Sequence, residues 1–313
     1  MAVKRTNPKR RVVRNPKSAK PMPRILMDQT MADVTKLLES RSFESIDEAN
    51  AYLQGLLAGG GTIPHPEPET PLEQAQELIY EAHEARSVKK RTELARQALT
   101  ISPDCADAYI LLAEQEPAPD KRLDLLEQGM AAGQRAIGAD QFAKWEGIFW
   151  GVTETRPYMR ACAGVGELAW MLGQRTRAIE LFTRMLLLNP SDNQGVRYML
   201  TNCLLEEGDD TGLAKLLNHY KDDAAANWAY SKALLRFRIL GHTARANTTL
   251  AKAITANPFI PPYLLGNKPM PKQLPDTIGF GDESEAIEYV AFAIRAWEQT
   301  PGALDWLRRN FAG

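Results

Sequence analysis

The sequence lacks long apolar runs. No segment approaches the roughly 20 consecutive apolar residues that cross a bilayer, so we expect no membrane span. The basic first residues are not followed by the apolar stretch that a secretory signal requires. These two absences argue against the membrane-spanning and secreted classes of protein.

Cysteine and histidine are scarce, at three and four of 313 residues. Cys105, Cys162 and Cys203 are odd in number, far apart and without CxxC spacing, which argues against a disulfide framework or a zinc site. The histidines form no HExxH pattern, and the GxSxG, GxGxxG and Walker patterns are missing. We therefore expect a reduced, cytoplasmic protein with no metal, no cofactor and no catalytic residue.

Acidic residues are absent from residues 1–24, which carry nine of the chain's 38 lysines and arginines. The remainder has 29 basic residues against 39 acidic ones, a net charge of about −10. Four prolines and few apolar residues predict that residues 1–24 are a disordered basic arm. Such an arm could contact nucleic-acid phosphates, or it could be a solvated tail or fold against the acidic body. No aromatic residue is present to stack on bases, which favours the second interpretation.

Beyond the arm, the pattern indicates a short helical segment, a linker and a helical body. Residues 25–61 are typical of two short helices, and Ser45 begins the capping box of the second. Residues 62–71 contain four prolines and read as a semi-rigid linker. Residues 72–313 show helical spacing throughout, and Thr70 is a candidate cap for the first helix of this body.

The helical body is repetitive. Residues 93–114, 178–200 and 246–265 share one order: an alanine-rich helix, a polar turn with proline, and a second helix. The turn prolines are Pro103, Pro190 and Pro258. Pro190 and Pro258 lie 68 residues apart, which is two periods of 34. Because Pro103 lies 87 residues before Pro190, the array is interrupted, and we expect an irregular insertion near residues 117–157.

A second marker of the same period is glycine. It falls between the two helices of each unit, where a left-handed turn is needed, at Gly173, Gly208 and Gly241. A helix-turn-helix period of about 34 residues resembles the tetratricopeptide repeat. Ala178, Phe182 and Pro190 match its small, aromatic and proline positions, and Gly166 fits a small position. The predicted fold class is all-α: a tetratricopeptide-like helical-repeat solenoid over residues 72–313, preceded by the disordered basic arm.

Three stretches carry a closer resemblance. They are SPDCADAYILLAEQE (102–116), LGQRTRAIELF (172–182), and the tail from NPFIPPYLLG to GDESEAIEYVAFAIRAWEQTPGALDWL (257–307). These stretches resemble the suppressor-of-tumorigenicity-seven family over roughly residues 90–310. The resemblance implies the helical-repeat fold, and it implies no defined biochemical activity.

Helical-repeat arrays bind partners in a concave groove that their first helices line. Counting Pro190 as position 32 of its unit predicts the groove residues, which are Arg160, Glu167, Gln194, Arg197, Tyr198, Thr201, Trp228, Lys232 and Arg238. Cations mixed with tyrosine and tryptophan favour a protein or peptide partner, and arginine forks would suit an acidic one. The alternative is internal: Arg160 pairs with Glu167, and Trp228 belongs to the core between repeats.

The segment FWGVTETRPYMRA (149–161) crowds aromatic and charged residues together at the predicted seam between insertion and array. Here Glu154, Arg156 and Tyr158 could form a structural seam with an internal ion pair, bind a partner, or belong to an undetected enzyme. The leading hypothesis is a non-enzymatic scaffold or adaptor that binds a peptide or partner protein in the groove. The alternative is a nucleic-acid-associated adaptor that uses residues 1–24, and an enzyme ranks third.

Overall fold

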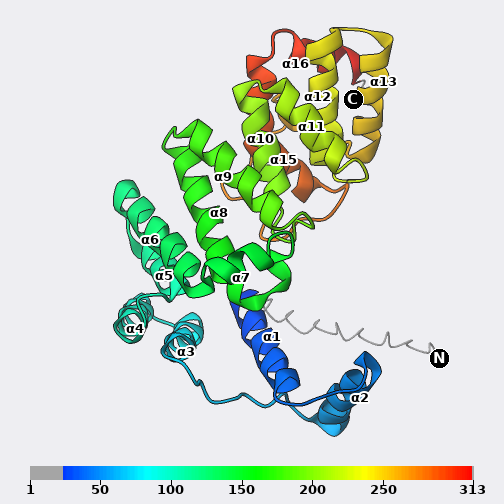
Figure 1. The fold of residues 1–313 in the computed structure, drawn as a ribbon. Helices are drawn as coiled ribbons and strands as arrows, with labels where there is room; N and C mark the ends of the chain where they lie inside the picture. Colours follow the sequence, from blue (N-terminus) through cyan, green and yellow to red (C-terminus); the bar gives the residue numbers. More distant parts are fainter. Residues whose placement is uncertain (1–23, 312–313) are drawn as a thin grey trace, which may run out of the picture. The chain divides into compact units, whose positions relative to one another are not determined.

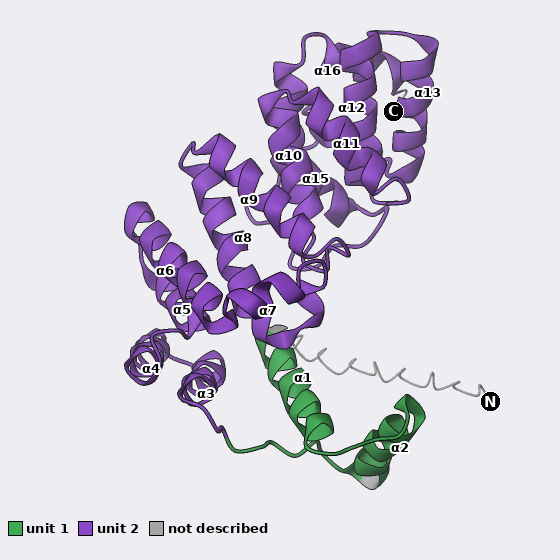
Figure 2. Ribbon diagram, in the orientation of Figure 1, with its two compact units in different colours: residues 1–67 green, residues 68–313 purple. Residues whose placement is uncertain are grey.

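The computed structural model describes residues 24–311, and the predicted arm of residues 1–24 lies outside this range except for Arg24. The described chain divides into two units, the first ending at Glu67 and the second beginning at Pro68 (Figure 2). Between residues 24 and 311 every regular element is a helix, and no strand occurs. This confirms the all-α class that the sequence predicts.

Unit 1 contains two helices and a short 3-10 turn. Its elements are α1 (Arg24–Glu39), α2 (Ile46–Leu57) and η1 (Ala58–Gly60). Ser45 caps α2, since its hydroxyl accepts a hydrogen bond from the backbone nitrogen of Glu48. The cap at which the sequence places the helix start is therefore confirmed.

Unit 2 is an array of helices (Figure 1). They are α3 (Pro71–Glu84), α4 (Val88–Ile101), α5 (Ala106–Gln115), α6 (Pro119–Ile137), α7 (Ala139–Lys144), η2 (Phe149–Gly151), η3 (Thr153–Thr155), α8 (Arg156–Met171), α9 (Arg175–Leu188), α10 (Val196–Glu207), α11 (Asp210–His219), α12 (Ala226–Leu240), α13 (Ala244–Ala256), α14 (Ile260–Leu264), α15 (Glu283–Gln299) and α16 (Ala303–Asn310). Within the described chain, consecutive helices pair into five hairpins, α3/α4, α5/α6, α8/α9, α10/α11 and α12/α13. This arrangement confirms the helical-repeat fold.

The repeat markers act as the sequence predicts. Gly173, Gly208 and Gly241 all have positive φ, at 79°, 71° and 62°, and each follows the first helix of its hairpin. Gly166 faces Phe182 of the paired helix, and a Cβ at Gly166 would come within 2.5 Å of the Phe182 ring. The small position on one helix therefore makes room for the aromatic side chain on the other.

The interruption in the array is shorter than the predicted 117–157. The helix α6 packs against α5 as the second member of an ordinary hairpin, so the extra residues between hairpins are 138–155. They form α7, η2 and η3. The turn between α5 and α6 has no glycine, whereas the same turn in the three later hairpins has Gly173, Gly208 or Gly241, and for this reason spacing alone does not assign α6 to a repeat.

The three cysteines are free and buried, so we expect them to be unreactive while the protein is folded. Burial raises the pKa of Cys105, Cys162 and Cys203 to about 12 in each case, which suppresses the reactive thiolate near neutral pH. An aromatic disulfide reagent such as DTNB should label the native protein very slowly and label all three thiols in denaturant. Fast labelling of the native protein at mild pH would contradict these burial assignments.

Candidate functional site

In unit 2 the first helices of the hairpins pack together in two sets. Helix α3 packs against α5, α5 against α8, and α10 against α12. We call their shared surface the first-helix face, and it is the surface on which the sequence predicts a groove. The two ends of this face differ: α3, α5 and α8 carry exposed side chains there, whereas α10 and α12 are covered by α15.

Asp107 connects the three helices at the first end. This carboxylate is only 2% exposed. It accepts hydrogen bonds from Nε2 of Gln76 on α3 at 3.1 Å, and from Nε and Nη2 of Arg160 on α8 at 2.9 and 2.6 Å. The two Arg160 bonds form a bidentate pair, which is the strong geometry for a guanidinium and a carboxylate. Arg160 therefore binds Asp107 and not Glu167, the partner considered from the sequence.

The sides of α5 and α8 that carry Asp107 and Arg160 also carry two exposed carboxylates farther along each helix. Glu114 lies two turns along α5 from Asp107, and Glu167 lies two turns along α8 from Arg160. Desolvation by the surrounding protein raises the pKa of both Glu167 and Glu114. At Glu114 the positive charge of Arg91 opposes this increase. Neither carboxylate forms an ion pair within residues 24–311. Their position leaves negative charge on an open part of the first-helix face.

Arg197 and Tyr198, on α10, belong to an internal network. Arg197 donates from Nε to Asp223 at 2.7 Å, from Nη1 to Asp192 at 2.9 Å and from Nη2 to the hydroxyl of Tyr198 at 2.8 Å. Its guanidinium also lies over the rings of Tyr198 and Tyr220, at 4.4 and 5.4 Å from their centroids. The fork that the sequence offers to an acidic ligand is therefore occupied by this chain's own aspartates.

A pocket of about 540 Å³ lies beside this network. Its lining includes four aromatic rings, those of Tyr198, His219, Tyr220 and Phe280. Phe280 is 82% exposed. Because all three donor nitrogens of Arg197 are engaged, the pocket presents aromatic faces and no uncommitted guanidinium.

Helix α15 covers the first-helix face of α10 and α12, and Figure 1 shows it alongside α10. On the same two helices, Thr201 is completely buried and donates to the carbonyl of Arg197, while Trp228 is 3% exposed and packs against the rings of Tyr198 and Tyr220. The alternative interpretation of Trp228 as a core residue therefore describes its position.

Arg238 is the third predicted groove arginine, and it joins α12 to α15. It donates from Nε to the hydroxyl of Thr300 at 2.9 Å and from Nη2 to the carbonyls of Leu205 and Ala296 at 2.9 and 3.3 Å. Its Nη1 pairs with Asp210 at 3.1 Å. The guanidinium thus satisfies backbone groups at helix ends and has no donor nitrogen left for a partner.

The other two predicted groove residues take different positions. Gln194 is half-buried in the turn before α10. Lys232 is exposed, and it lines a smaller groove between α11 and α12 instead of the face under α15.

The seam residues do not converge. Glu154 is exposed and accepts a hydrogen bond from the hydroxyl of Thr153 at 3.0 Å, not an ion pair from Arg156. Arg156 donates to the carbonyl of Trp150 at 3.0 Å and lies over that ring. Tyr158 is buried and packs edge-to-face against the rings of Phe142 and Phe149. Two of the three side chains therefore pack residues 138–155 against α8.

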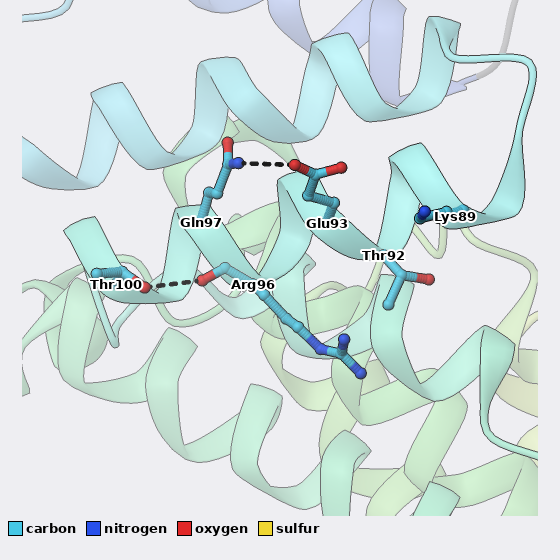
Figure 3. Close-up of a pocket in the computed structure, with 6 residues that line it drawn as sticks. All are labelled: Lys89, Thr92, Glu93, Arg96, Gln97 and Thr100. Carbon is cyan, nitrogen blue, oxygen red and sulfur yellow. Dashed lines mark hydrogen bonds between the residues drawn. The ribbon is translucent and has the colours of Figure 1, made fainter.

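A further pocket of about 460 Å³ lies on the surface of α4. Its lining residues are Lys89, Thr92, Glu93, Arg96, Gln97 and Thr100, all of one helix (Figure 3). They satisfy one another in part, since Gln97 donates to Glu93 at 3.4 Å and Thr100 to the carbonyl of Arg96 at 3.1 Å. A pocket lined by a single helix is a shallow surface and not an enclosed site.

Two further observations concern ligands and membranes. No cluster of three or more histidine, cysteine, aspartate or glutamate side chains in residues 24–311 is arranged to hold a metal ion. Within the same residues, no helix combines the length and the hydropathy that crossing a bilayer requires.

Comparison with known proteins identifies relatives. No family model matches the chain. A protein ST7 homolog from Drosophila pseudoobscura pseudoobscura is 26% identical over 261 residues, covering 76% of this chain and 48% of the relative. A suppressor of tumorigenicity 7 protein-like from Homo sapiens is 27% identical over 273 residues, covering 77% and 46%. This chain is similar to ST7 proteins. The resemblance predicted from its sequence is confirmed, and the chain spans about half the length of the ST7 relatives that it matches.

Solved structures are also similar, among them the "Crystal structure of YrrB: a TPR protein with an unusual peptide-binding site". It aligns with 59% of this chain and 84% of its own, at 17% identity and a TM-score of 0.41.

Sequence reasoning missed Asp107 and Glu114. Both lie on α5, seven residues apart and so on one stripe of the helix. The turn proline Pro103 marks the start of this helix, and the same register applied after it would have placed both carboxylates on the first-helix face. Asp223, the partner of Arg197, has no such signal because it lies in a turn 26 residues away.

Proposed function

We propose that this protein is a non-catalytic scaffold that binds a segment of a partner protein on the first-helix face of α3, α5 and α8. One observation carries the proposal: Glu114 and Glu167 are exposed on this face, whereas α15 occupies the corresponding face of α10 and α12. Concave faces of helical repeats commonly bind extended peptides. The three buried free thiols favour action in a reducing compartment, the cytoplasm.

The charges on this face favour a basic segment over the acidic one that the sequence suggests. The Arg160 guanidinium is neutralised by the buried Asp107, so it offers little to an incoming carboxylate. Glu114 and Glu167 form no ion pair among the described residues and are partly desolvated before a partner arrives. A lysine or arginine of a partner placed beside either carboxylate would supply the opposite charge that Glu167 lacks in the free protein and would add to the effect of Arg91 on Glu114.

Charge reversal tests this proposal. The double variant Glu114→Lys/Glu167→Lys is expected to bind basic peptides of about nine residues at least about tenfold more weakly than the wild type. The measurement is fluorescence anisotropy with labelled basic, neutral and acidic peptides of matched length. A matched control is Glu93→Lys/Glu180→Lys, which makes the same charge change on α4 and α9, outside the first-helix face. Equal loss in both variants, or preference for the acidic peptides, would contradict the proposal.

The binding should also depend on pH. Because desolvation raises the pKa of both carboxyl groups in the free protein, part of their charge is lost as the pH falls. A bound cation favours the ionised form, so binding releases protons, and affinity for the basic peptide should fall from about pH 7 to about pH 5. The Glu114→Gln/Glu167→Gln variant removes both titrations and should flatten this profile. An unchanged profile in that variant would assign the dependence to other groups.

A further inference from the structure

A second surface of unit 2 lies between α11 and α12. It is a groove of about 230 Å³, which we call the cationic groove. From α11 and the turn after it come Leu217, Asn218 and Lys221, and α12 supplies Lys232, Arg236 and Ile239. This groove is separate from the first-helix face, because the α12 residues that α15 contacts, such as Arg238, are not among its lining.

The cationic groove carries three positive charges and no acidic residue in its lining. Lys221, Lys232 and Arg236 make no hydrogen bond or ion pair within residues 24–311. By contrast, Arg160, Arg197 and Arg238 are all paired internally. The concentration also contrasts with the remainder after residue 24, in which acidic residues outnumber basic ones by 39 to 29. Uncompensated charge of one sign attracts a ligand of the opposite sign.

The groove also has an apolar component. Leu217 and Leu235 are 6% and 7% exposed and form its floor, while Ile239 is 61% exposed at one end. Lys232, Leu235, Arg236 and Ile239 follow one another at helical spacing, so charged and apolar groups alternate along one side of α12. An occupant must therefore match both the cations and the exposed isoleucine.

We propose that the cationic groove binds an acidic amphipathic helix of a partner protein. Its α12 side extends over eight residues, from Lys232 to Ile239, and the seven steps of about 1.5 Å between them give about 11 Å, which accommodates about two turns of a guest helix. Apolar residues of the guest at i and i+4 would cover Leu235 and Ile239, and flanking glutamates or aspartates would pair with the three cations. No tyrosine, tryptophan or phenylalanine lines the groove for base stacking, which favours such a helix over single-stranded nucleic acid.

Designed peptides test the proposal directly. The probe is a fluorescein-labelled helical peptide with leucine at i and i+4 and flanking glutamates, titrated by anisotropy at low and at physiological salt. The Lys232→Glu/Arg236→Glu variant is expected to bind it at least about tenfold more weakly than the wild type. A matched control is Arg245→Glu/Lys252→Glu on α13, where both side chains are exposed outside the groove, and this variant should bind normally.

Two further arms separate the contributions. Ile239→Ser keeps every charge of the groove and should lower its affinity for the acidic peptide severalfold. If binding were purely ionic, this substitution would leave the affinity unchanged. A peptide with lysine in place of glutamate should not bind. Equal binding by the groove and control variants, binding of the lysine peptide, or preference for a single-stranded RNA oligomer would overturn the proposal. These arms do not involve Glu114 or Glu167, so this proposal and the proposed function fail independently.

Discussion

Replacing Trp297 by alanine is expected to lower the free energy of unfolding by about 3–5 kcal/mol, the cost of removing a buried large aromatic side chain. Trp297 is completely buried on α15. Its Nε1 donates to the hydroxyl of Tyr289 at 2.9 Å, and its ring lies 6.3 Å from that of Trp306 and 6.5 Å from that of Tyr230. The substitution leaves a cavity where α15 meets α12 and α16. Urea unfolding followed by circular dichroism measures the change.

A matched substitution separates packing from hydrogen bonding at this position. Trp297→Phe keeps most of the aromatic volume but removes the indole donor, so it should lower the unfolding free energy much less, by about 1–3 kcal/mol. A Trp297→Ala effect below about 1 kcal/mol would mean that α15 is not packed on the repeats as described. The face of α10 and α12 would then be open in solution.

Replacing Glu285 by alanine is expected to cost about 3–5 kcal/mol, because one buried carboxylate serves three donors and its loss leaves all of them without an acceptor. Glu285, near the start of α15, is 5% exposed. It accepts from the backbone nitrogens of Ala226 at 2.8 Å and Gly281 at 2.7 Å, and from Nδ2 of Asn257 at 3.0 Å. These contacts attach α15 to the beginning of α12 and to the turn after α13.

The loss of stability in Glu285→Ala should be concentrated in the helices that Glu285 connects. Hydrogen exchange of α12, α13 and α15 should accelerate in Glu285→Ala more than that of α3 to α6, since repeat arrays lose stability mainly near the altered interface. Glu285→Gln keeps one acceptor oxygen and should cost less than the alanine variant. A uniform change across all hairpins, or no change, would argue against the attachment of α15 through this residue.

The repeat fold was predictable from short-range features. Glycine between paired helices is required by a positive φ, and a small residue at Gly166 is required by the ring of Phe182. Both constraints act within one hairpin, so they recur at the period of the hairpin and can be found by spacing. The assignment of α6 to a hairpin was less accessible because no such marker precedes it.

Whether the predicted groove residues are available to a partner was harder to predict from the sequence, as the three arginines show. Register places Arg160, Arg197 and Arg238 on first helices, and all three are there. Their partners, however, are Asp107, 53 residues away, and side chains 26 and 28 residues away on other elements. A partly buried guanidinium must be paired, but which carboxylate pairs with it depends on how hairpins stack. Spacing contains no information on that choice.

The local sequence was sufficient for most helix positions, the turn glycines and the pairing of helices within the later hairpins, because hydrogen bonds and packing within about 34 residues determine them. Whether each surface is covered or exposed depended on contacts between segments that are distant in the sequence. The tail folds back as α15 over α10 and α12, whereas Glu114, Glu167 and Lys232 stay exposed. Those exposures follow from the burial of apolar side chains such as Trp297 by the whole chain, and no periodicity along the sequence encodes them.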